Sequence, residues 1–342
     1  MNESNNQKIR FAIVGYGHIG KRHGTMIMNN PECELVAVCD NNTEEKTKLT
    51  NQGIHFFCSL DEMLQADLEL SVVCIATPNG LHEEQAIKSL RAGFHVVIEK
   101  PMALTKAGCE RIIFESLHQH KQVFCVMQNR YSPPSRWLKE IMQKKILGEI
   151  FMVQVDCYWN RDDRYYTPGN WHGTKLLDGG TLFTQFSHFI DIMFWLFGDI
   201  KNIGGKITNF SHQKSTEFED SGFIHFDFVN GGMGSLNFST SIWNQNLESS
   251  MTIIAEKGTV KVGGQYMNEL QTSVIKDYTM PALAPVNPPN DYGPYKGSAA
   301  NHHFIFENVV NVLKGRETIT TNALEGMKVV EIIEKIYQSA SR

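Results

Sequence analysis

Apolar and polar positions follow one rhythm up to about residue 126 of this chain. Short apolar runs rich in Val and Ile are separated by stretches whose apolar residues recur at helical spacing, as in Leu81–Ala92. Uninterrupted apolar runs are typical of strands buried on both faces, and strands that alternate with helices form a parallel sheet. Residues 1–128 are therefore expected to form a doubly wound α/β domain. The expected strands are Ile9–Val14, Leu35–Cys39, Leu70–Ala76, His95–Ile98 and Val123–Val126.

The rhythm changes after about residue 127. A Pro-rich break at residues 132–134 opens an amphipathic stretch that predicts a helix to Ile146, and residues 181–197 have helical length. Around residues 224–228 and 236–242, apolar side chains occupy every second position, so each of these strands has one core face. Residues 129–342 are therefore expected to form an α+β domain with an open-faced, mainly antiparallel sheet. The other expected elements are strands at Ile150–Tyr158, Met251–Ala255 and Thr259–Val262, a loop over residues 280–297, and closing helices near Asn301–Leu313 and Ala323–Ser339, which can pack back on the first domain.

The second face of the strand at 236–242 is small and polar. Its residues are Ser235, Asn237, Ser239 and Ser241. A flat face of this kind suits contact with a second copy of the chain, although plain exposure to solvent explains it nearly as well. We expect a homo-oligomer, a dimer or tetramer, that forms through this open sheet face.

Composition and charge exclude several classes of function. The formal net charge is −5 and no basic stripe is present, which argues against a nucleic-acid partner. The most apolar stretch, Phe183–Phe197, is interrupted by His188 and Asp191, so no membrane span is expected. Seven cysteines, an odd number without C-x-x-C spacing, favour buried apolar thiols, a reducing cytoplasmic setting and no metal site.

A glycine-rich turn directly follows the first expected strand. The sequence Gly15-Tyr16-Gly17-His18-Ile19-Gly20 has the G-x-G-x-x-G spacing, and Asp40 ends the next strand twenty residues later. Gly15 suits a tight turn, Gly17 lets the backbone approach a pyrophosphate, and Gly20 lets the helix lie close to the strand. This predicts a Rossmann dinucleotide site, the alternative being a glycine turn without a ligand.

Asp40 also predicts which dinucleotide binds. A carboxylate there accepts hydrogen bonds from the adenosine ribose and repels a 2′-phosphate, and the following Asn41 offers no positive charge. NAD is therefore expected rather than NADP.

Two further loops follow expected strands of the same sheet. One is Ala76-Thr77-Pro78-Asn79 with His82 after it, and the other is Glu99-Lys100-Pro101. Open α/β sheets bind ligands at the carboxyl ends of their strands, so both loops are expected at the cofactor. A helix cap explains Asn79 equally well, and a surface lysine is the alternative for Lys100.

These motifs together resemble the Gfo/Idh/MocA family of oxidoreductases. The matching pieces are GYGHIG, Asp40, ATPNGLH, EKP and the helix that carries His188, followed by the open-faced sheet. The resemblance implies that Lys100 and His188 are catalytic, that Gln128 joins the cofactor contacts, and that the Lys100–Pro101 peptide bond is cis.

Many family members carry an aspartate four residues before the histidine, where this chain has Thr184 followed by Gln185. Within the family the chain is most similar to UDP-N-acetyl-2-amino-2-deoxy-D-glucuronate 3-dehydrogenases, which also lack that aspartate. The matching stretches are Gln128–Arg130, Tyr158–Arg161, Tyr165-Tyr166, Trp171, Asp178–Gly180, Gln185–His188, Asn246–Glu248, Glu256–Val260 and Gly263-Gly264.

The resemblance implies oxidation of a sugar hydroxyl, at C3 of a UDP-sugar uronate in the narrower reading, by hydride transfer to NAD. Either His188 or Lys100 can accept the hydroxyl proton, and the sequence does not separate these roles. The expected substrate contacts are Arg130, Tyr166, Trp171, Thr184 and Gln185.

Other residues and other functions remain as alternatives. Arg161, Arg164 and Lys175 can help to bind an anionic sugar, but Asp162 and Asp163 lie among them, as in a mixed surface loop. Rival functions are another sugar or cyclitol dehydrogenase, a glycosidase that recycles bound NAD, and a non-catalytic ligand sensor. Retention of both Lys100 and His188 counts against the sensor, which needs no proton acceptor.

Overall fold

The computed structural model describes residues 7–167, 169–293 and 295–341. The chain divides into two compact units. The first combines Met1–Val126 with His302–Met327, and the second combines Met127–Asn301 with Lys328–Arg342. The first boundary lies within two residues of the expected one at 128, and the closing segment, which was expected to be able to pack back on the first domain, is divided between the two units. Helix α8 (His302–Leu313) belongs to the first unit, where Phe306 meets Phe11 of the first strand with ring centroids 6.0 Å apart.

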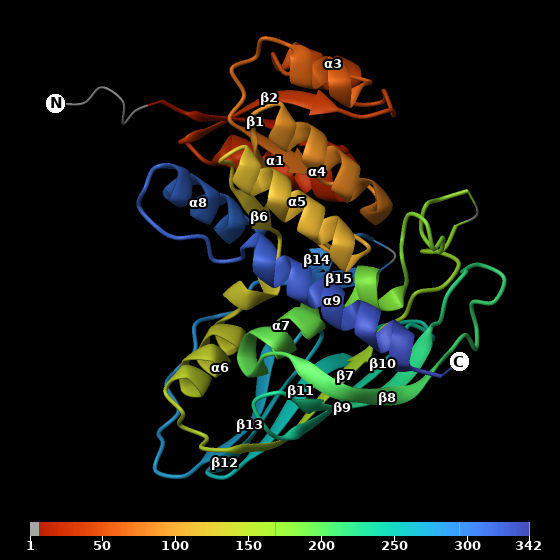
Figure 1. Cartoon of the computed structure of the whole chain (residues 1–342), viewed down its shortest axis with the longest axis vertical. Coiled ribbons are helices and arrows are strands. Elements are labelled where there is room, and N and C mark those ends of the chain that lie inside the picture. Colours follow the sequence, from red (N-terminus) through yellow and green to blue (C-terminus); the bar gives the residue numbers. More distant parts are fainter. Residues whose placement is uncertain (1–6, 168, 294, 342) are drawn as a thin grey trace. The chain divides into compact units, whose positions relative to one another are not determined.

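The first unit contains a six-stranded parallel sheet (Figure 1) with the order β3-β2-β1-β4-β5-β6. The chain runs from β1 outward through β2 to β3, then returns to the other side of β1 for β4. The order thus reverses between β1 and β4, which is the switch point where open α/β sheets bind ligands. The elements before α8 are β1 (Ile9–Val14), α1 (His18–Asn29), β2 (Cys33–Cys39), α2 (Lys46–Asn51), β3 (His55–Phe57), α3 (Leu60–Gln65), β4 (Val72–Ile75), η2 (Asn79–Leu81), α4 (His82–Arg91), β5 (His95–Ile98), α5 (Lys106–His118) and β6 (Val123–Cys125).

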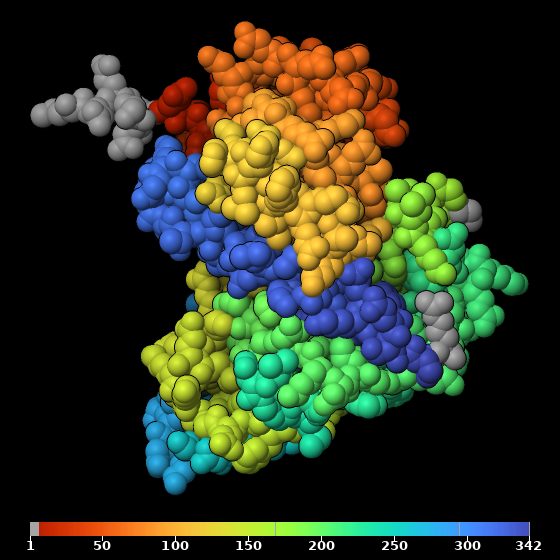
Figure 2. Space-filling view, in the orientation of Figure 1, coloured from red at the N-terminus to blue at the C-terminus, as the bar shows by residue number. Residues whose placement is uncertain are grey.

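The central strands of this sheet are buried on both faces. All four residues of β4 have no exposed surface, and the expected buried thiols of Cys39, Cys74 and Cys125 lie in or beside the sheet. Helices α4 and α5 pack against one another and form adjacent parts of the unit's surface (Figure 2). The doubly wound parallel sheet predicted from the apolar runs is confirmed.

The second unit is built on a seven-stranded sheet with the order β13-β12-β11-β7-β10-β9-β8. Every neighbouring pair is antiparallel except β7 and β10, which run parallel, so the mainly antiparallel sheet is also confirmed. Helix α7 packs on β7 and α6 packs on α7, and both lie over the same face (Figure 1). The elements are η3 (Gln128–Tyr131), α6 (Pro133–Gln143), β7 (Ile150–Tyr158), η4 (Leu182–Phe186), α7 (Ser187–Phe197), β8 (Ile200–Thr208), β9 (Ser221–Phe228), β10 (Met233–Ser239), β11 (Glu248–Ala255), β12 (Gly258–Gly263), β13 (Glu269–Ile275), β14 (Pro289–Asp291), β15 (Lys296–Ala299) and α9 (Ala323–Ser339), of which the part from Lys328 onward belongs here.

The open face of this sheet is less polar than the sequence suggests. Small polar residues do line β10. However, Met152 on β7 is paired in register with Met233 on β10 and with Ile254 on β11, so these three side chains form an apolar row across three strands. Their side chains are 38%, 58% and 42% exposed, and Phe223 on β9 is 71% exposed. The sequence missed this row because its members come from strands far apart along the chain.

Several expected strands differ by one to three residues at an end, and β3, β8 and β13 were not expected; three other elements differ in kind or length. Helix α6 ends at Gln143 rather than Ile146, since Lys145 adopts a left-handed backbone with φ 52° before Gly148. The helix expected over residues 181–197 begins with a π-helical segment, η4, and becomes α-helical at Ser187. Residues 280–297 are not only loop, because β14 and β15 pair there as a small antiparallel sheet. Among the described residues, no helix combines the length and apolar character that crossing a membrane requires.

Candidate active site

The glycine-rich turn has the geometry that a pyrophosphate needs. Gly15 has φ 86°, a conformation that favours glycine, and it joins β1 to α1 through Gly17, the N-cap residue. No atom lies within 4 Å of the place that a Cβ on Gly17 would take, whereas a Cβ on Gly20 would overlap the carbonyl oxygen of Gly15. His18 and Ile19 form the first turn of α1, whose N-cap makes no side-chain hydrogen bond. The geometry of Gly15 and Gly20 suits the turn and the close helix packing, and the contact of Gly17 with a pyrophosphate stays a prediction.

Asp40 lies at the carboxyl end of β2 beside this turn. One carboxylate oxygen accepts a hydrogen bond from the backbone N–H of Tyr16 at 2.5 Å, and the other accepts from that of Asn42 at 2.7 Å. A carboxylate has about four acceptor sites, so both oxygens can still accept from ribose hydroxyls. Asn41, beside it, is exposed.

The two other predicted loops follow the neighbouring strands β4 and β5. Ala76, Thr77 and Pro78 are partly exposed, and a Cβ on Gly15 would lie 2.6 Å from the carbonyl oxygen of Ala76, so the first loop touches the glycine turn. Asn79 is buried at the start of η2. These loops therefore meet at the switch point of the sheet.

Lys100 follows β5 and is partly exposed. The peptide bond between Lys100 and Pro101 is cis, as the family resemblance implies.

His82 and Glu99 lie behind these loops rather than on their outer surface. The ring nitrogens of His82, a residue with no exposed surface, contact the carbonyl oxygens of Thr77 at 2.9 Å and Pro101 at 2.7 Å. Glu99 accepts a hydrogen bond from the Lys100 backbone N–H at 3.2 Å. Both residues help to hold the two loops in place, and their expected contact with the cofactor stays a prediction.

Glu99 also belongs to a buried group with His23 and His302. The Glu99 carboxylate lies 2.8 Å from Nε2 of His23 and 3.8 Å from Nε2 of His302. Burial alone would raise the pKa of Glu99, but the hydrogen bond from His23 and nearby positive groups lower it to about 2. Burial lowers the pKa of His302 to about 3, so its ring is neutral at pH 7.

Three ligand atoms within 4.8 Å of one another make this group a possible metal site. Metal-bound imidazoles usually donate their second N–H to a partner, but in the described part of the chain Nδ1 of His23 and of His302 has none. We therefore assign the group a structural role beneath the Lys100 loop.

In the second unit, His188 lies in the first turn of α7 and is 3% exposed. Its Nε2 atom lies 3.2 Å from the amide nitrogen Nε2 of Gln128, which begins η3. Both side chains are buried, and the carbonyl oxygen of Gln128 has no hydrogen-bond partner among the described residues. A buried acceptor without a donor is costly, so Gln128 fits the prediction that it contacts a bound ligand.

The charge of Arg130 is compensated inside the protein. Its guanidinium makes a two-pronged ion pair with Asp191, with Nε–Oδ2 and Nη2–Oδ1 distances of 2.8 and 2.5 Å, and both side chains are 1% exposed. Because Asp191 neutralises this charge, Arg130 is less suited to a substrate anion than the sequence suggests, and its expected substrate contact stays a prediction. The sequence missed the pair because the partners lie 61 residues apart.

Thr184, where many family members have aspartate, contacts a carboxylate from elsewhere. Its hydroxyl donates to a side-chain oxygen of Asp178, which is 1% exposed. Asp178 also accepts a hydrogen bond from the backbone N–H of Gly173 at 2.8 Å. A carboxyl group is therefore present beside this position, although the sequence spacing gave no sign of it.

Gln185 is held in a buried chain of polar contacts. Its carbonyl oxygen accepts from Nε of Arg161 at 2.7 Å, and its amide donates to the hydroxyl of Tyr165 at 2.8 Å. Arg161 is 2% exposed, and the rings of Trp159, Tyr165 and Tyr295 lie within 5.3 Å of its guanidinium carbon. No described carboxylate forms an ion pair with Arg161, and burial lowers its pKa. The expectation of a surface loop with mixed charges is thus confirmed for Arg164, which forms an ion pair with Asp162 at 2.6 Å. It is wrong for Arg161, which is buried.

Tyr166 and Trp171 lie near this chain of contacts. Tyr166 is 3% exposed and packs with Tyr165 and Phe218, while Trp171 is partly exposed and its ring lies 3.8 Å from that of His172. His212 lies 5.1 Å from the Tyr166 ring.

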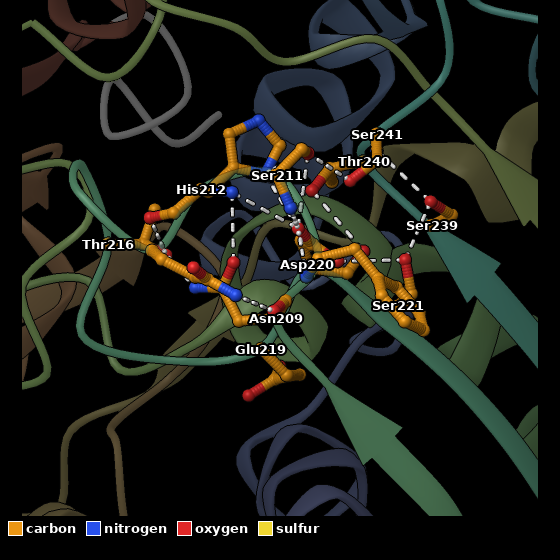
Figure 3. A network of polar contacts seen from close by, with 12 residues as sticks. Asn209, Ser211, His212, Thr216, Glu219, Asp220, Ser221, Ser239, Thr240 and Ser241 are labelled. Carbon is orange, nitrogen blue, oxygen red and sulfur yellow. Dashed lines mark hydrogen bonds and ion pairs between the residues drawn. The ribbon is translucent and has the colours of Figure 1, made fainter.

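A polar network fixes His212 in turn (Figure 3). The Asp220 carboxylate accepts from the backbone N–H groups of Phe210 and Ser211, from the His212 ring and from the Ser221 hydroxyl, at 2.8 to 3.2 Å. Burial alone would raise the pKa of Asp220, but these donors keep it far below its ordinary value. The network therefore holds the His212 ring in place beside the ring of Tyr166.

Comparison with known families agrees with this geometry. Residues 9–127 match a family described as oxidoreductases with an NAD-binding Rossmann fold, and residues 135–261 match the Gfo/Idh/MocA C-terminal domain. A solved structure that is 33% identical covers 97% of this chain and 96% of its own, with a TM-score of 0.85. The chain belongs to the Gfo/Idh/MocA oxidoreductase family.

That solved structure is the WlbA dehydrogenase of Bordetella pertussis in complex with NADH and UDP-GlcNAcA. The WlbA dehydrogenase of Chromobacterium violaceum, with the same two ligands, is 31% identical, covers 98% of this chain and 94% of its own, and has a TM-score of 0.87. Among sequence relatives, D-glucoside 3-dehydrogenase of Escherichia coli is 23% identical over 97% of this chain and 95% of its own length. The chain is an NAD-binding oxidoreductase, as predicted.

The first unit has the features that NAD requires. Space beside Gly17 admits a pyrophosphate, the α1 N-terminus faces that space, and the Asp40 carboxylate is set for a ribose. When bound there, NAD supplies the hydride acceptor that the chain's own side chains lack.

Proposed function

We propose that this member of the Gfo/Idh/MocA family is a dehydrogenase that oxidises the C3 hydroxyl of a UDP-N-acetylaminosugar uronate with NAD. The observation that carries the proposal is the similarity over nearly the whole chain to two WlbA dehydrogenases, each in complex with NADH and UDP-GlcNAcA. The pairing of Thr184 with Asp178 supports it further, since this site contains a carboxylate close to the helix that carries His188.

In the proposed reaction the substrate loses a hydride from C3 and a proton from its hydroxyl. His188 accepts that proton, because an imidazole titrates near neutral pH. Lys100 donates a hydrogen bond to the same oxygen and stabilises the negative charge that develops there. The opposite assignment, with Lys100 as the base, is an outcome of the test below.

We assign recognition of the substrate's negative charge to Arg161 rather than Arg130. Arg130 is neutralised by Asp191, whereas Arg161 is held by neutral oxygens and aromatic rings. A buried positive charge without a carboxylate partner attracts an anion strongly, because the surrounding dielectric is low.

The substrate assignment is tested by measuring NADH production with three UDP-sugars. We expect turnover with UDP-N-acetylglucosaminuronate, and at least tenfold lower kcat/KM with UDP-N-acetylglucosamine, which lacks the carboxylate, and with UDP-glucuronate, which lacks the acetamide. Equal activity with all three would contradict the narrow assignment and leave a broader sugar dehydrogenase.

The catalytic roles are tested with Lys100→Ala and His188→Ala. Each should lower kcat by about 10²- to 10⁴-fold, the usual contribution of a positioned acid or base, and leave NADH affinity within about twofold. Lys106→Ala, at a partly exposed position of α5, is the matched control. Unchanged turnover in either variant would remove that residue from the mechanism. If His188→Ala alone removes the acid limb of the pH profile, His188 is the base, and if Lys100→Ala does so, Lys100 is.

The same assay separates the rival functions. A glycosidase that recycles bound NAD would cleave a glycosidic bond without accumulating NADH, and a ligand sensor would bind NAD and sugar without turnover. Accumulation of one NADH for each sugar oxidised is the result expected here.

We also propose that the chain forms a homo-oligomer through the open sheet face. The exposed row of Met152, Met233 and Ile254, together with Phe223, gives that face an apolar surface that contact with a second copy would cover. Met233→Glu should lower the mass measured by light scattering, and an unchanged mass would exclude this face.

A further inference from the structure

The turn that carries Gln128 and the helix that carries His188 are joined at two buried points. One is the 3.2 Å contact between the Gln128 amide nitrogen and Nε2 of His188. The other is the ion pair between Arg130, two residues after Gln128, and Asp191, nearly one helical turn after His188. The two points lie on the same short element η3 and on the same helix α7.

The first contact has a chemical consequence for the imidazole. With its amide nitrogen toward the ring, Gln128 can only donate, so a hydrogen bond there requires Nε2 of His188 to be the unprotonated nitrogen; with the amide oxygen toward the ring, Nε2 would carry the proton. A neutral imidazole with a bare Nε2 carries its proton on Nδ1. The orientation of the Gln128 amide therefore determines which ring nitrogen of His188 carries the proton.

We infer that Gln128 is a positioning residue that keeps Nε2 of His188 unprotonated, and that the buried Arg130–Asp191 pair holds Gln128 in place. The inference deepens the proposed function and rests on it for its catalytic meaning. Nε2 is then ready to take a proton as soon as a substrate hydroxyl replaces the Gln128 amide. Without Gln128, the proton is free to move to Nε2, and a fraction of the enzyme starts in the wrong tautomer.

The ion pair suits this role because its geometry leaves little freedom. The planar guanidinium meets both carboxylate oxygens, and its carbon lies 5.3 Å from the ring centroid of Trp195, one turn beyond Asp191. Both charged side chains are 1% exposed, so water does not loosen the pair. Moving the backbone of η3 away from α7 would require separating two charges in a medium of low dielectric, so the pair fixes the position from which the Gln128 side chain reaches His188.

The tautomer is measured directly by NMR of the protein labelled with ¹⁵N-histidine, without cofactor or substrate. The chain has 13 histidines, and the His188 signals are identified by their loss in His188→Gln. We expect a single tautomer with the proton on Nδ1, and a mixture of tautomers in Gln128→Leu. Gln65→Leu, at an exposed position of α3, is the matched control and should leave the His188 signals unchanged. A proton on Nε2 in the unaltered protein would overturn the inference.

The ion pair is tested by replacing both partners together. Asp191→Asn alone leaves a buried guanidinium uncompensated and can prevent folding, whereas Arg130→Met with Asp191→Leu replaces the pair by apolar groups, a change that proteins often tolerate. In the folded double variant we expect mixed tautomers of His188 and a kcat lower by about tenfold. Glu140→Gln, which breaks an exposed ion pair on α6, is the control for loss of a charge pair. A double variant that keeps one tautomer and full turnover would show that the pair does not position Gln128.

The two readouts separate the inference from the proposed function. If the tautomer is as expected but His188→Ala keeps full turnover, the inference about Gln128 stands and the catalytic proposal fails. If His188→Ala abolishes turnover but Gln128→Leu leaves the tautomer unchanged, the catalytic proposal stands and the inference fails.

Discussion

Replacement of Gly17 by alanine tests the cofactor site with little effect on folding. Gly17 is the N-cap of α1, its φ of −72° is accessible to alanine, and no atom lies within 4 Å of the new Cβ. Alanine is a somewhat poorer N-cap than glycine, so the free energy of unfolding should fall by less than about 1 kcal/mol. The new methyl group occupies the space that we assign to the pyrophosphate.

The expected loss of NADH affinity follows from that overlap. A displaced phosphate loses at least one hydrogen bond from a backbone N–H, and hydrogen bonds to charged groups contribute about 1.5–3 kcal/mol. This corresponds to an increase in Kd of about 10- to 200-fold. Titration calorimetry with NADH measures the change, and thermal unfolding monitored by circular dichroism measures stability.

Two further glycine variants bracket the result. Gly20→Ala should destabilise the fold by about 1–3 kcal/mol or more, because its Cβ overlaps the Gly15 carbonyl oxygen. Gly53→Ala, at φ 80° with open space around its Cβ, should cost about 1 kcal/mol of backbone strain and leave NADH affinity unchanged. Wild-type affinity in Gly17→Ala would refute the placement of the pyrophosphate at this turn.

Three other predictions follow from individual side chains. Asp40→Ser should lower the preference for NAD over NADP by at least tenfold, since it removes the charge that repels a 2′-phosphate, and an unchanged ratio of Kd values would exclude Asp40 as the determinant. Burial lowers the pKa of His302 from 6.5 to about 3. Between pH 6.5 and pH 3 the unfolded chain therefore binds a proton at His302 that the folded protein does not. The free energy of unfolding should fall as the pH drops through this range. His302→Gln should flatten this part of the pH–stability curve, by about 2 kcal/mol at pH 5, and a curve parallel to that of the unaltered protein would contradict the lowered pKa. Asp220→Asn should destabilise the protein by about 2–3 kcal/mol, because its amide nitrogen cannot accept from the donors that surround it, and an unchanged urea midpoint would contradict that role.

The expected strands illustrate how far periodicity reaches. Ile9–Val14 and His95–Ile98 were predicted to the residue, because central parallel strands are mostly apolar and these two are followed directly by Gly15 and Glu99. Helix α6 was predicted three residues too long, since its last turn is ended by the left-handed backbone of Lys145 and not by a pattern of side chains. The π-helical start of the α7 segment left no trace in the sequence, as side-chain spacing there is still compatible with an α-helix.

The candidate site divides in the same way. The roles of Gly15 and Gly20 follow from backbone geometry within one turn, so spacing alone predicts them. Arg130 was expected to meet a substrate anion because its residue type suits one, but a carboxylate 61 residues away already pairs with it. The buried environment of Arg161 was missed for the same reason, since its aromatic neighbours come from separate segments.

The sequence by itself predicted most strands of the two sheets and the nucleotide-binding turn, because each depends on residues that are neighbours along the chain or recur at a fixed spacing. Tertiary structure decided which charges are available for chemistry. Whether a guanidinium, a carboxylate or an amide meets a ligand depends on the partners that folding brings to it, and long-range contacts such as those of Arg130 with Asp191 and of Gln128 with His188 have no periodicity in the sequence.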